Sequence, residues 1–136
     1  MPVSFELDET TGSLRIRSCG EASVDDFVAQ AKLLFGRQRV PRPLHIFLDL
    51  REMTPLPTAQ EIRGARDSLI RLRGRVTFGC CAVLAEQDAT YGMARMWSIL
   101  VEEIFAAVSV FRSADEAEQW FRAVVRPGQQ TSSRNG

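Results

Sequence analysis

Hydrophobic and polar residues alternate along the first part of the chain. Val3, Phe5 and Leu7 are separated by polar residues, and this period of two predicts a half-buried strand over residues 3–8. The stretch ETTG that follows is typical of a turn. A second alternating stretch, residues 14–18, then predicts a strand that returns antiparallel to the first as a hairpin.

Apolar residues at helical spacing predict four helices farther along the chain. These helices are expected over residues 23–35, 58–72, 89–106 and 113–125. Three more strands are expected over residues 44–50, 77–85 and 108–112. The stretch TFGCCAVLA at residues 77–85 is almost continuously apolar, which is typical of a central strand covered on both faces.

The predicted order is therefore ββαβαβαβα. Strands separated by single helices favour parallel pairing with right-handed crossovers, while the hairpin adds one antiparallel pair. We expect one α/β domain at residues 1–126, built on a five-stranded mixed, mainly parallel sheet with four helices. Residues 127–136 contain no apolar side chain and are predicted to form a disordered tail.

Composition excludes several classes of function. The chain has 17 Lys and Arg against 17 Asp and Glu, so its net charge gives no attraction to nucleic acid or to an anionic membrane. No apolar run approaches the roughly 20 residues that a membrane span needs, and no secretory signal is visible. Three cysteines, two of them adjacent, predict buried free thiols and a cytoplasmic location rather than a disulfide framework.

The residues offer little for catalysis. His45 is the only histidine, and no metal ligand lies near it at useful spacing, although a cysteine could approach it in the folded chain. Asp49 and Glu52 follow a strand at the edge where α/β sheets bind ligands, but such an Asp more often caps the loop. No phosphate-binding glycine loop is present. We therefore expect a protein that is not an enzyme, with no cofactor and no metal.

Three stretches resemble a known family. They are LHIFLDLREM at residues 44–53, YGMARMWSIL at 91–100 and VSVFRSADEAEQWF at 108–121. Together with the element order, they are similar to the STAS domain in its SpoIIAA-like branch, the fold of anti-sigma factor antagonists and of sulfate-transporter tails. The resemblance spans about Phe5 to Phe121. It implies a non-enzymatic regulatory module of bacterial signalling that binds another protein.

The resemblance also directs attention to Thr58. Phospho-regulated members carry an Asp-Ser-Ser-Gly motif at the start of a helix, and here PTAQ at residues 57–60 stands in its place. Only Thr58 keeps a hydroxyl group, so it is the candidate phosphoacceptor. Thr58 and Glu61 also form a capping-box pattern, which recurs at Ser23 and Ser113. This repetition favours Thr58 as a helix cap.

A docking surface is expected on the loop at residues 51–57 and the outer face of the second predicted helix. Between residues 36 and 75 there are nine arginines against four acidic residues, and arginine is common in protein contacts. The candidate contact residues are Arg51, Glu52, Met53, Arg63, Arg66, Ile70 and Arg73.

The alternative function is a carrier of a small apolar ligand between sheet and helices. An apolar stripe of Tyr91, Met93, Met96 and Trp97 could line such a pocket, and an exposed loop at residues 53–56 could gate it. Helical spacing of this kind is more often core. The even charge favours neither a monomer nor a homodimer.

Overall fold

The structure, a computed structural model, describes residues 3–21, 23–37 and 39–125, so the predicted tail at 127–136 lies outside the described residues. The predicted order ββαβαβαβα is confirmed. The elements are β1 (Val3–Asp8), β2 (Ser13–Ser18), α1 (Val24–Arg37), β3 (Leu44–Asp49), α2 (Ala59–Leu72), β4 (Phe78–Leu84), α3 (Asp88–Leu100), β5 (Ala107–Phe111) and α4 (Ala114–Val125).

The five strands form one sheet in the order β1-β2-β3-β4-β5. β1 and β2 pair antiparallel, with Val3 opposite Ser18, and all later pairs are parallel. The hairpin turn depends on Gly12, whose φ of 70° is in the left-handed region, and on Asp8, whose side chain accepts from the Thr10 amide at 2.9 Å. The mixed, mainly parallel sheet expected from the sequence is confirmed.

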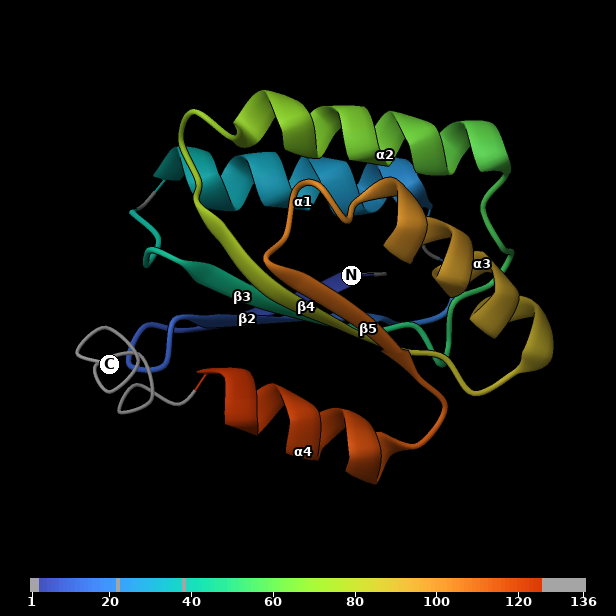
Figure 1. The fold of residues 1–136 in the computed structure, drawn as a ribbon. Helices are drawn as coiled ribbons and strands as arrows, with labels where there is room; N and C mark the ends of the chain where they lie inside the picture. The colour runs from blue at the N-terminus through green and yellow to red at the C-terminus, as the bar shows by residue number, and fades with distance from the viewer. Residues whose placement is uncertain (1–2, 22, 38, 126–136) are drawn as a thin grey trace.

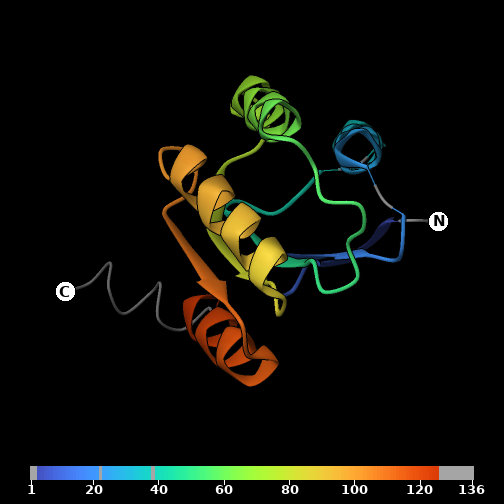
Figure 2. The same ribbon diagram turned by 90° about the vertical axis from the view of Figure 1, so that its right-hand side faces the viewer.

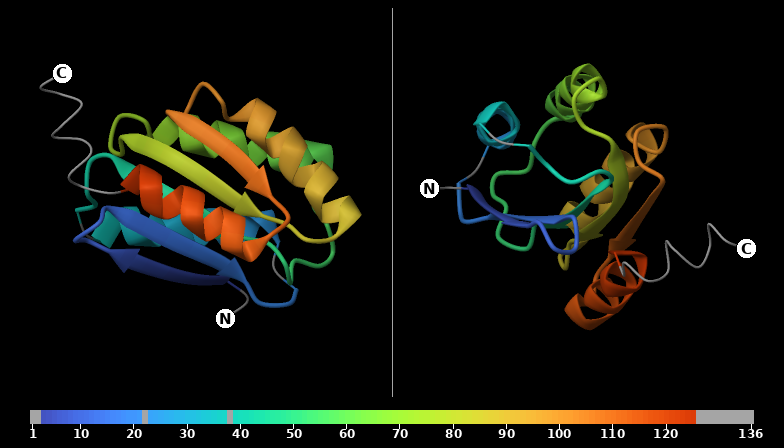
Figure 3. Two further views of the ribbon diagram at one scale, coloured as in Figure 1. Left: turned by 60° about the horizontal axis from the view of Figure 1, so that its bottom comes forward. Right: turned by 90° about the vertical axis from the view of Figure 1, so that its left-hand side faces the viewer.

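The strand order decides where the helices lie. β2 to β5 are added one after another in the same direction, so right-handed crossovers place α1, α2 and α3 on a single face of the sheet. α4 follows the last strand and packs on the opposite face (Figure 1). The left view of Figure 3 shows α4 in front of the strands, with α1 to α3 behind them. The central strands are thereby covered on both faces.

Each face of the sheet has its own core. The larger core lies beneath α1, α2 and α3 and includes Leu14, Ile46 and Val83. The smaller core lies beneath α4, where Phe121 packs edge-on against Phe47 with ring centroids 5.3 Å apart. The continuous apolar run of β4 supplies both cores, because neighbouring residues of a strand point to opposite faces.

The third helix is shorter than expected. It ends at Leu100, whereas the apolar spacing predicts a helix to Ala106. After Leu100 the chain tightens into turns, with the Ile104 amide bonded to the Val101 carbonyl at 2.9 Å. Val101 and Ile104 stay buried through these turns, so the apolar spacing continues although the helix does not. The predicted end at Ala106 was wrong for this reason.

Candidate functional site

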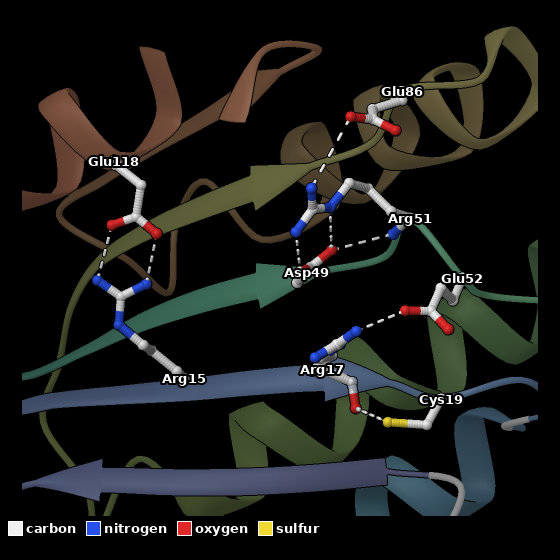
Figure 4. Close-up of polar contacts among 8 residues, drawn as sticks. All are labelled: Arg15, Arg17, Cys19, Asp49, Arg51, Glu52, Glu86 and Glu118. Atoms are coloured by element: carbon white, nitrogen blue, oxygen red, sulfur yellow. Dashed lines mark hydrogen bonds and ion pairs between the residues drawn. The ribbon is translucent and has the colours of Figure 1, made fainter. Parts of the chain in front are cut away.

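The carboxyl edge of the sheet carries a group of ion pairs (Figure 4). Asp49 accepts two hydrogen bonds from the Arg51 guanidinium, at 3.0 and 2.8 Å, and one from the Arg51 amide at 3.2 Å. Burial raises the pKa of Asp49, but these hydrogen bonds more than offset it, so the pKa lies below its usual value. Asp49 is therefore an ionised residue that holds its own loop, as the capping interpretation expected.

Two further contacts hold the loop after β3. Glu52 accepts from Arg17 at 2.7 Å, although both side chains are more than half exposed. The backbone of Met53 pairs with that of Gly20, which extends the β2–β3 pairing into the loop. Arg51 Nη1 also lies 3.9 Å from a carboxylate oxygen of Glu86, which follows β4. Arg51 and Glu52 thus already have partners within the protein.

Met53 does not lie where the sequence analysis placed it. Its side chain is 9% exposed and packs in the larger core, so the expectation of an exposed Met53 was wrong. The Met53 amide bonds the Leu50 carbonyl at 3.2 Å in a tight turn. Leu56, with 37% exposure, is the exposed large apolar residue of this loop.

The expected docking residues on α2 also differ in availability. Arg66 pairs with its neighbour Asp67 at 2.9 Å, and Arg73 donates to the Glu103 carbonyl at 2.7 Å. Ile70 is 43% exposed, as expected from its place among the arginines. Arg63 is exposed and makes no ion pair or hydrogen bond with any described residue. Arg63 and Ile70 are the two residues of the set that remain open to a partner.

Thr58 forms the capping box that its sequence indicates. Its hydroxyl accepts from the Glu61 amide at 3.1 Å, and the Glu61 carboxylate accepts from the Thr58 amide at 2.8 Å. Ser23 and Asp26 make the same pair of hydrogen bonds at α1. A phosphate on Thr58 would meet the Glu61 carboxylate, which opposes its attraction to the helix N-terminus. The geometry favours a cap, and phosphorylation of Thr58 stays a prediction.

A cavity of about 130 Å³ lies between the sheet and helices α1, α2 and α3. It is of similar size to an engineered cavity of about 150 Å³ that holds benzene. Its lining is almost wholly apolar and includes Phe5, Phe27, Ile46, Leu69, Met93 and Trp97. Met93 and Trp97 were expected in such a pocket, whereas Tyr91 and Met96 of the same stripe do not line it.

Small side chains on the inner faces of two helices explain the cavity. Ala31 of α1 and Ala65 and Ser68 of α2 all face it, where larger residues would have filled the space. Met53 and Pro57 of the loop after β3 also line it, so the loop closes one side. The sequence analysis expected this loop to gate a pocket but did not identify the small residues that create one.

His45 lies on the other face of the sheet and has a structural role. Its Nδ1 accepts a hydrogen bond from the Cys80 backbone amide at 2.9 Å, so the contact does not involve the thiol. The cysteine–histidine nucleophile pair considered from the sequence is therefore not formed by Cys80. Accepting at Nδ1 places the proton of the neutral ring on Nε2. Burial lowers the pKa of His45, which favours this neutral form.

The cysteines are free, as expected, but only one is fully buried. Cys81 is buried and Cys80 half-buried, whereas Cys19 is exposed, so the expectation of buried thiols was wrong for Cys19. Burial raises the pKa of the Cys81 thiol, and the neighbouring Trp97 N–H lowers it less. Among the residues that the structure describes, no three His, Cys, Asp or Glu side chains gather closely enough to hold a metal.

We expect the stability of the protein to fall on mild acidification because of His45. The unfolded chain takes up a proton on this residue near its ordinary pKa of 6.5, while the folded chain does so only at lower pH. The free energy of unfolding should therefore decrease from pH 6.5 to 5, by at most about 1.4 kcal/mol per pH unit. Asp49 and Glu118 have lowered pKa values, so the stability that their ionised carboxylates contribute is lost only below about pH 4.5.

Urea denaturation at several pH values measures this dependence. The variant His45→Asn is the matched control, because its Oδ1 can accept from the Cys80 amide without titrating. Its free energy of unfolding should stay level between pH 6.5 and 5. Parallel profiles for the two proteins would show that His45 is not the titrating group.

Comparisons with known proteins bear on the fold. No family model and no curated protein matches this chain. The structure of an uncharacterized protein of the DUF3478 family from Shewanella loihica PV-4, described as having a SpoIIAA-like fold, aligns with a TM-score of 0.59. The alignment covers 88% of this chain and 93% of that one. This chain has a SpoIIAA-like fold.

The fold expected from the resemblance is therefore confirmed. Identity to the Shewanella protein is 12%, so the likeness concerns the SpoIIAA-like fold alone. Within the described residues, none of the helices has the length and apolar character needed to cross a membrane.

Proposed function

We propose that this SpoIIAA-like domain binds a small apolar molecule in the cavity between its sheet and helices α1 to α3. One observation carries the proposal, namely an open space of about 130 Å³ whose lining is almost wholly apolar. Protein interiors are normally close-packed, and side chains around a void lose contact partners. A ligand that fills the space restores those contacts.

The proposal is for binding without catalysis. Among the described residues that line the cavity, only Lys32, Ser68 and Trp97 carry a polar group on the side chain, and the surface they present to the cavity is almost entirely apolar. Among the described residues, no histidine, cysteine or carboxylate lines the cavity, so they supply it with neither a general base nor an activated nucleophile. The free thiols are consistent with a reducing cytoplasm, which we propose as the compartment.

Toluene is a suitable probe because its ring matches the benzene-sized space. A dissociation constant of about 1 mM corresponds to about −4.1 kcal/mol. Spread over toluene's seven carbons, this is about −0.6 kcal/mol per atom, well within the limit of about −1.5 for very small ligands. We therefore expect binding at about 1 mM or tighter.

Tryptophan fluorescence can report this binding from inside the cavity. Trp97 lines the cavity, whereas Trp120 packs against the smaller core on the opposite face of the sheet. A Trp120→Phe variant therefore leaves Trp97 as the sole tryptophan. Its emission should change saturably with toluene, while a Trp97→Phe variant should show no saturable change.

Filling the cavity should abolish this response. In the Trp120→Phe background, Ala65→Phe places a ring in the space and should weaken toluene binding at least about tenfold, since ring and ligand compete for one volume. Ala59→Phe is the matched control, because Ala59 is an exposed residue of the same helix. Ala31→Leu, from α1, gives a second test if Ala65→Phe fails to fold. Equal binding by all these variants would contradict the cavity as the site.

Protein docking through α2 is the second candidate function. The exposed Ile70 and the unpaired Arg63 support it, since apolar and arginine side chains are common at interface centres. We expect Arg63→Glu combined with Ile70→Asp to abolish partner capture from cell extract without changing the circular dichroism spectrum. Arg122→Glu on α4 is the control. Unchanged capture by the double variant would count against docking here.

A further inference from the structure

The cavity has one charged residue at its rim. Lys32 of α1 lines the cavity although the residue as a whole is exposed, and it is the only lysine in the chain. A lysine side chain can cover apolar surface with its methylene groups while its ammonium group stays in water. Among the described residues, Lys32 has no ion-pair partner. Its charge is thus not neutralised by a described residue.

A second polar group comes from the neighbouring helix. Ser68 of α2 also lines the cavity and is 9% exposed. Its hydroxyl lies 3.1 Å from Nη2 of Arg71, which donates to it. Arg71 makes no ion pair with a described residue, so its positive charge is not neutralised there. The Ser68–Arg71 pair thus places a second positive charge beside the cavity, on its α2 side.

The fold brings these two groups to neighbouring helices. α1 and α2 each connect two parallel strands, so they run in the same direction, side by side (Figures 1 and 2). Lys32 of α1 and Ser68 of α2 line the same cavity. The seam between the two helices thus carries Lys32 on one side and the Ser68–Arg71 pair on the other.

We propose that the ligand is a carboxylate-bearing apolar molecule whose carboxylate lies at this seam and whose apolar part fills the cavity. This inference rests on the proposed function and adds the charge of the ligand to it. A carboxylate suits the seam because Lys32 and Arg71 supply positive charge beside the cavity, while no acidic residue among those described lines it. The apolar part is about as bulky as a benzene ring.

Matched ligand pairs separate the charge from the apolar part. Hexanoate and 1-hexanol form an aliphatic pair, and benzoate and benzyl alcohol an aromatic pair. We expect Lys32→Met to weaken binding of the anion about twofold to fivefold, the range that an exposed ion pair contributes, and to leave the alcohol within twofold. Arg71→Met should act in the same way. The pair with the larger effect identifies an aliphatic or an aromatic acid.

Two controls make the test specific. Lys32→Arg keeps the charge and should retain anion affinity, and Arg122→Met on the opposite face of the sheet should change neither ligand. The anion-specific effect of Lys32→Met should disappear in about 1 M salt, where screening acts over roughly 3 Å.

The outcomes distinguish this inference from the proposed function. If the alcohols bind but Lys32→Met and Arg71→Met leave anion affinity unchanged, the anionic class is wrong while the cavity remains a binding site. If neither alcohol nor anion binds the wild-type protein, both proposals fail. An effect of the variants on alcohol and anion alike would show a packing role for these side chains, and it would overturn the inference.

Discussion

Truncation of Phe121 to alanine should lower the free energy of unfolding by about 3–5 kcal/mol, the usual cost of removing a buried aromatic ring. Phe121 is 1% exposed at the centre of the contact between α4 and the sheet. Its ring packs edge-on against Phe47, and the Arg15 guanidinium lies 5.4 Å from its centroid. Removing the ring would leave a void and would also weaken the site that holds Arg15.

The polar contact above this core adds to the expected loss. Arg15 donates two hydrogen bonds to Glu118 of α4, at 2.7 and 2.8 Å (Figure 4). Its guanidinium also lies over both phenylalanine rings. This pair is partly exposed, so its own contribution is expected to be small. The burial of the ring dominates the contact of α4 with the sheet.

Urea denaturation followed by circular dichroism measures the effect of Phe121→Ala. Ile99→Ala is a suitable control, because Ile99 is 62% exposed and its truncation should change the free energy of unfolding by about 0.5 kcal/mol or less. A loss below about 1 kcal/mol for Phe121→Ala would show that α4 is not packed on the sheet as described.

The second large effect is expected at Gly79, where alanine should cost about 1–3 kcal/mol, as is typical of an overfilled core. A Cβ atom at this position would lie 2.5 Å from two atoms of the His45 ring and 3.2 Å from Pro43 Cβ. The ring cannot move away freely, since its Nδ1 accepts from the Cys80 amide. The absence of a side chain at Gly79 is thus what admits His45 to the sheet.

The chain contains a matched control for this substitution. Gly64 lies inside α2, and a Cβ atom there would meet nothing within 4 Å, so Gly64→Ala should stabilise the protein by about 1 kcal/mol through helix propensity. Opposite signs for the two glycine variants in thermal and urea denaturation would support the close contact. A neutral Gly79→Ala would contradict it.

Sequence patterns were sufficient for the fold because its elements have strong periodicity. The alternation at residues 3–8, the apolar run at 77–85 and the helical spacing in between each predicted an element that the structure contains. Errors arose where a pattern continues beyond its element. Val101 and Ile104 keep the apolar spacing of α3 after the helix has ended, since the turns that follow are buried as well.

The cavity could be predicted only in part. Met93 and Trp97 indicated an apolar lining, but the space itself arises because Ala31 and Ala65 meet across two helices. Which small residues face each other depends on the packing of α1 and α2 on the sheet, and one sequence does not determine this. The same holds for Arg73, whose partner Glu103 lies thirty residues farther along the chain.

The contacts of the expected docking residues could also be predicted from the sequence only in part. The pairing of Arg51 with Asp49 joins residues two positions apart and could have been anticipated from the sequence. The burial of Met53 could not, because it follows from the backbone pairing with Gly20 in a distant segment. Fewer residues are therefore available for docking than the sequence predicted, whereas the structure contains a cavity of the kind that ligand binding requires.

Methyl NMR of the methionines tests the central claim most directly. Met53 and Met93 line the cavity, whereas Met96 lies on α3 outside the lining and serves as an internal control. On titration of the wild-type protein with toluene, we expect the methyl signals of Met53 and Met93 to shift saturably and that of Met96 to stay nearly unchanged. Equal, non-saturating shifts of all three signals would contradict binding in the cavity.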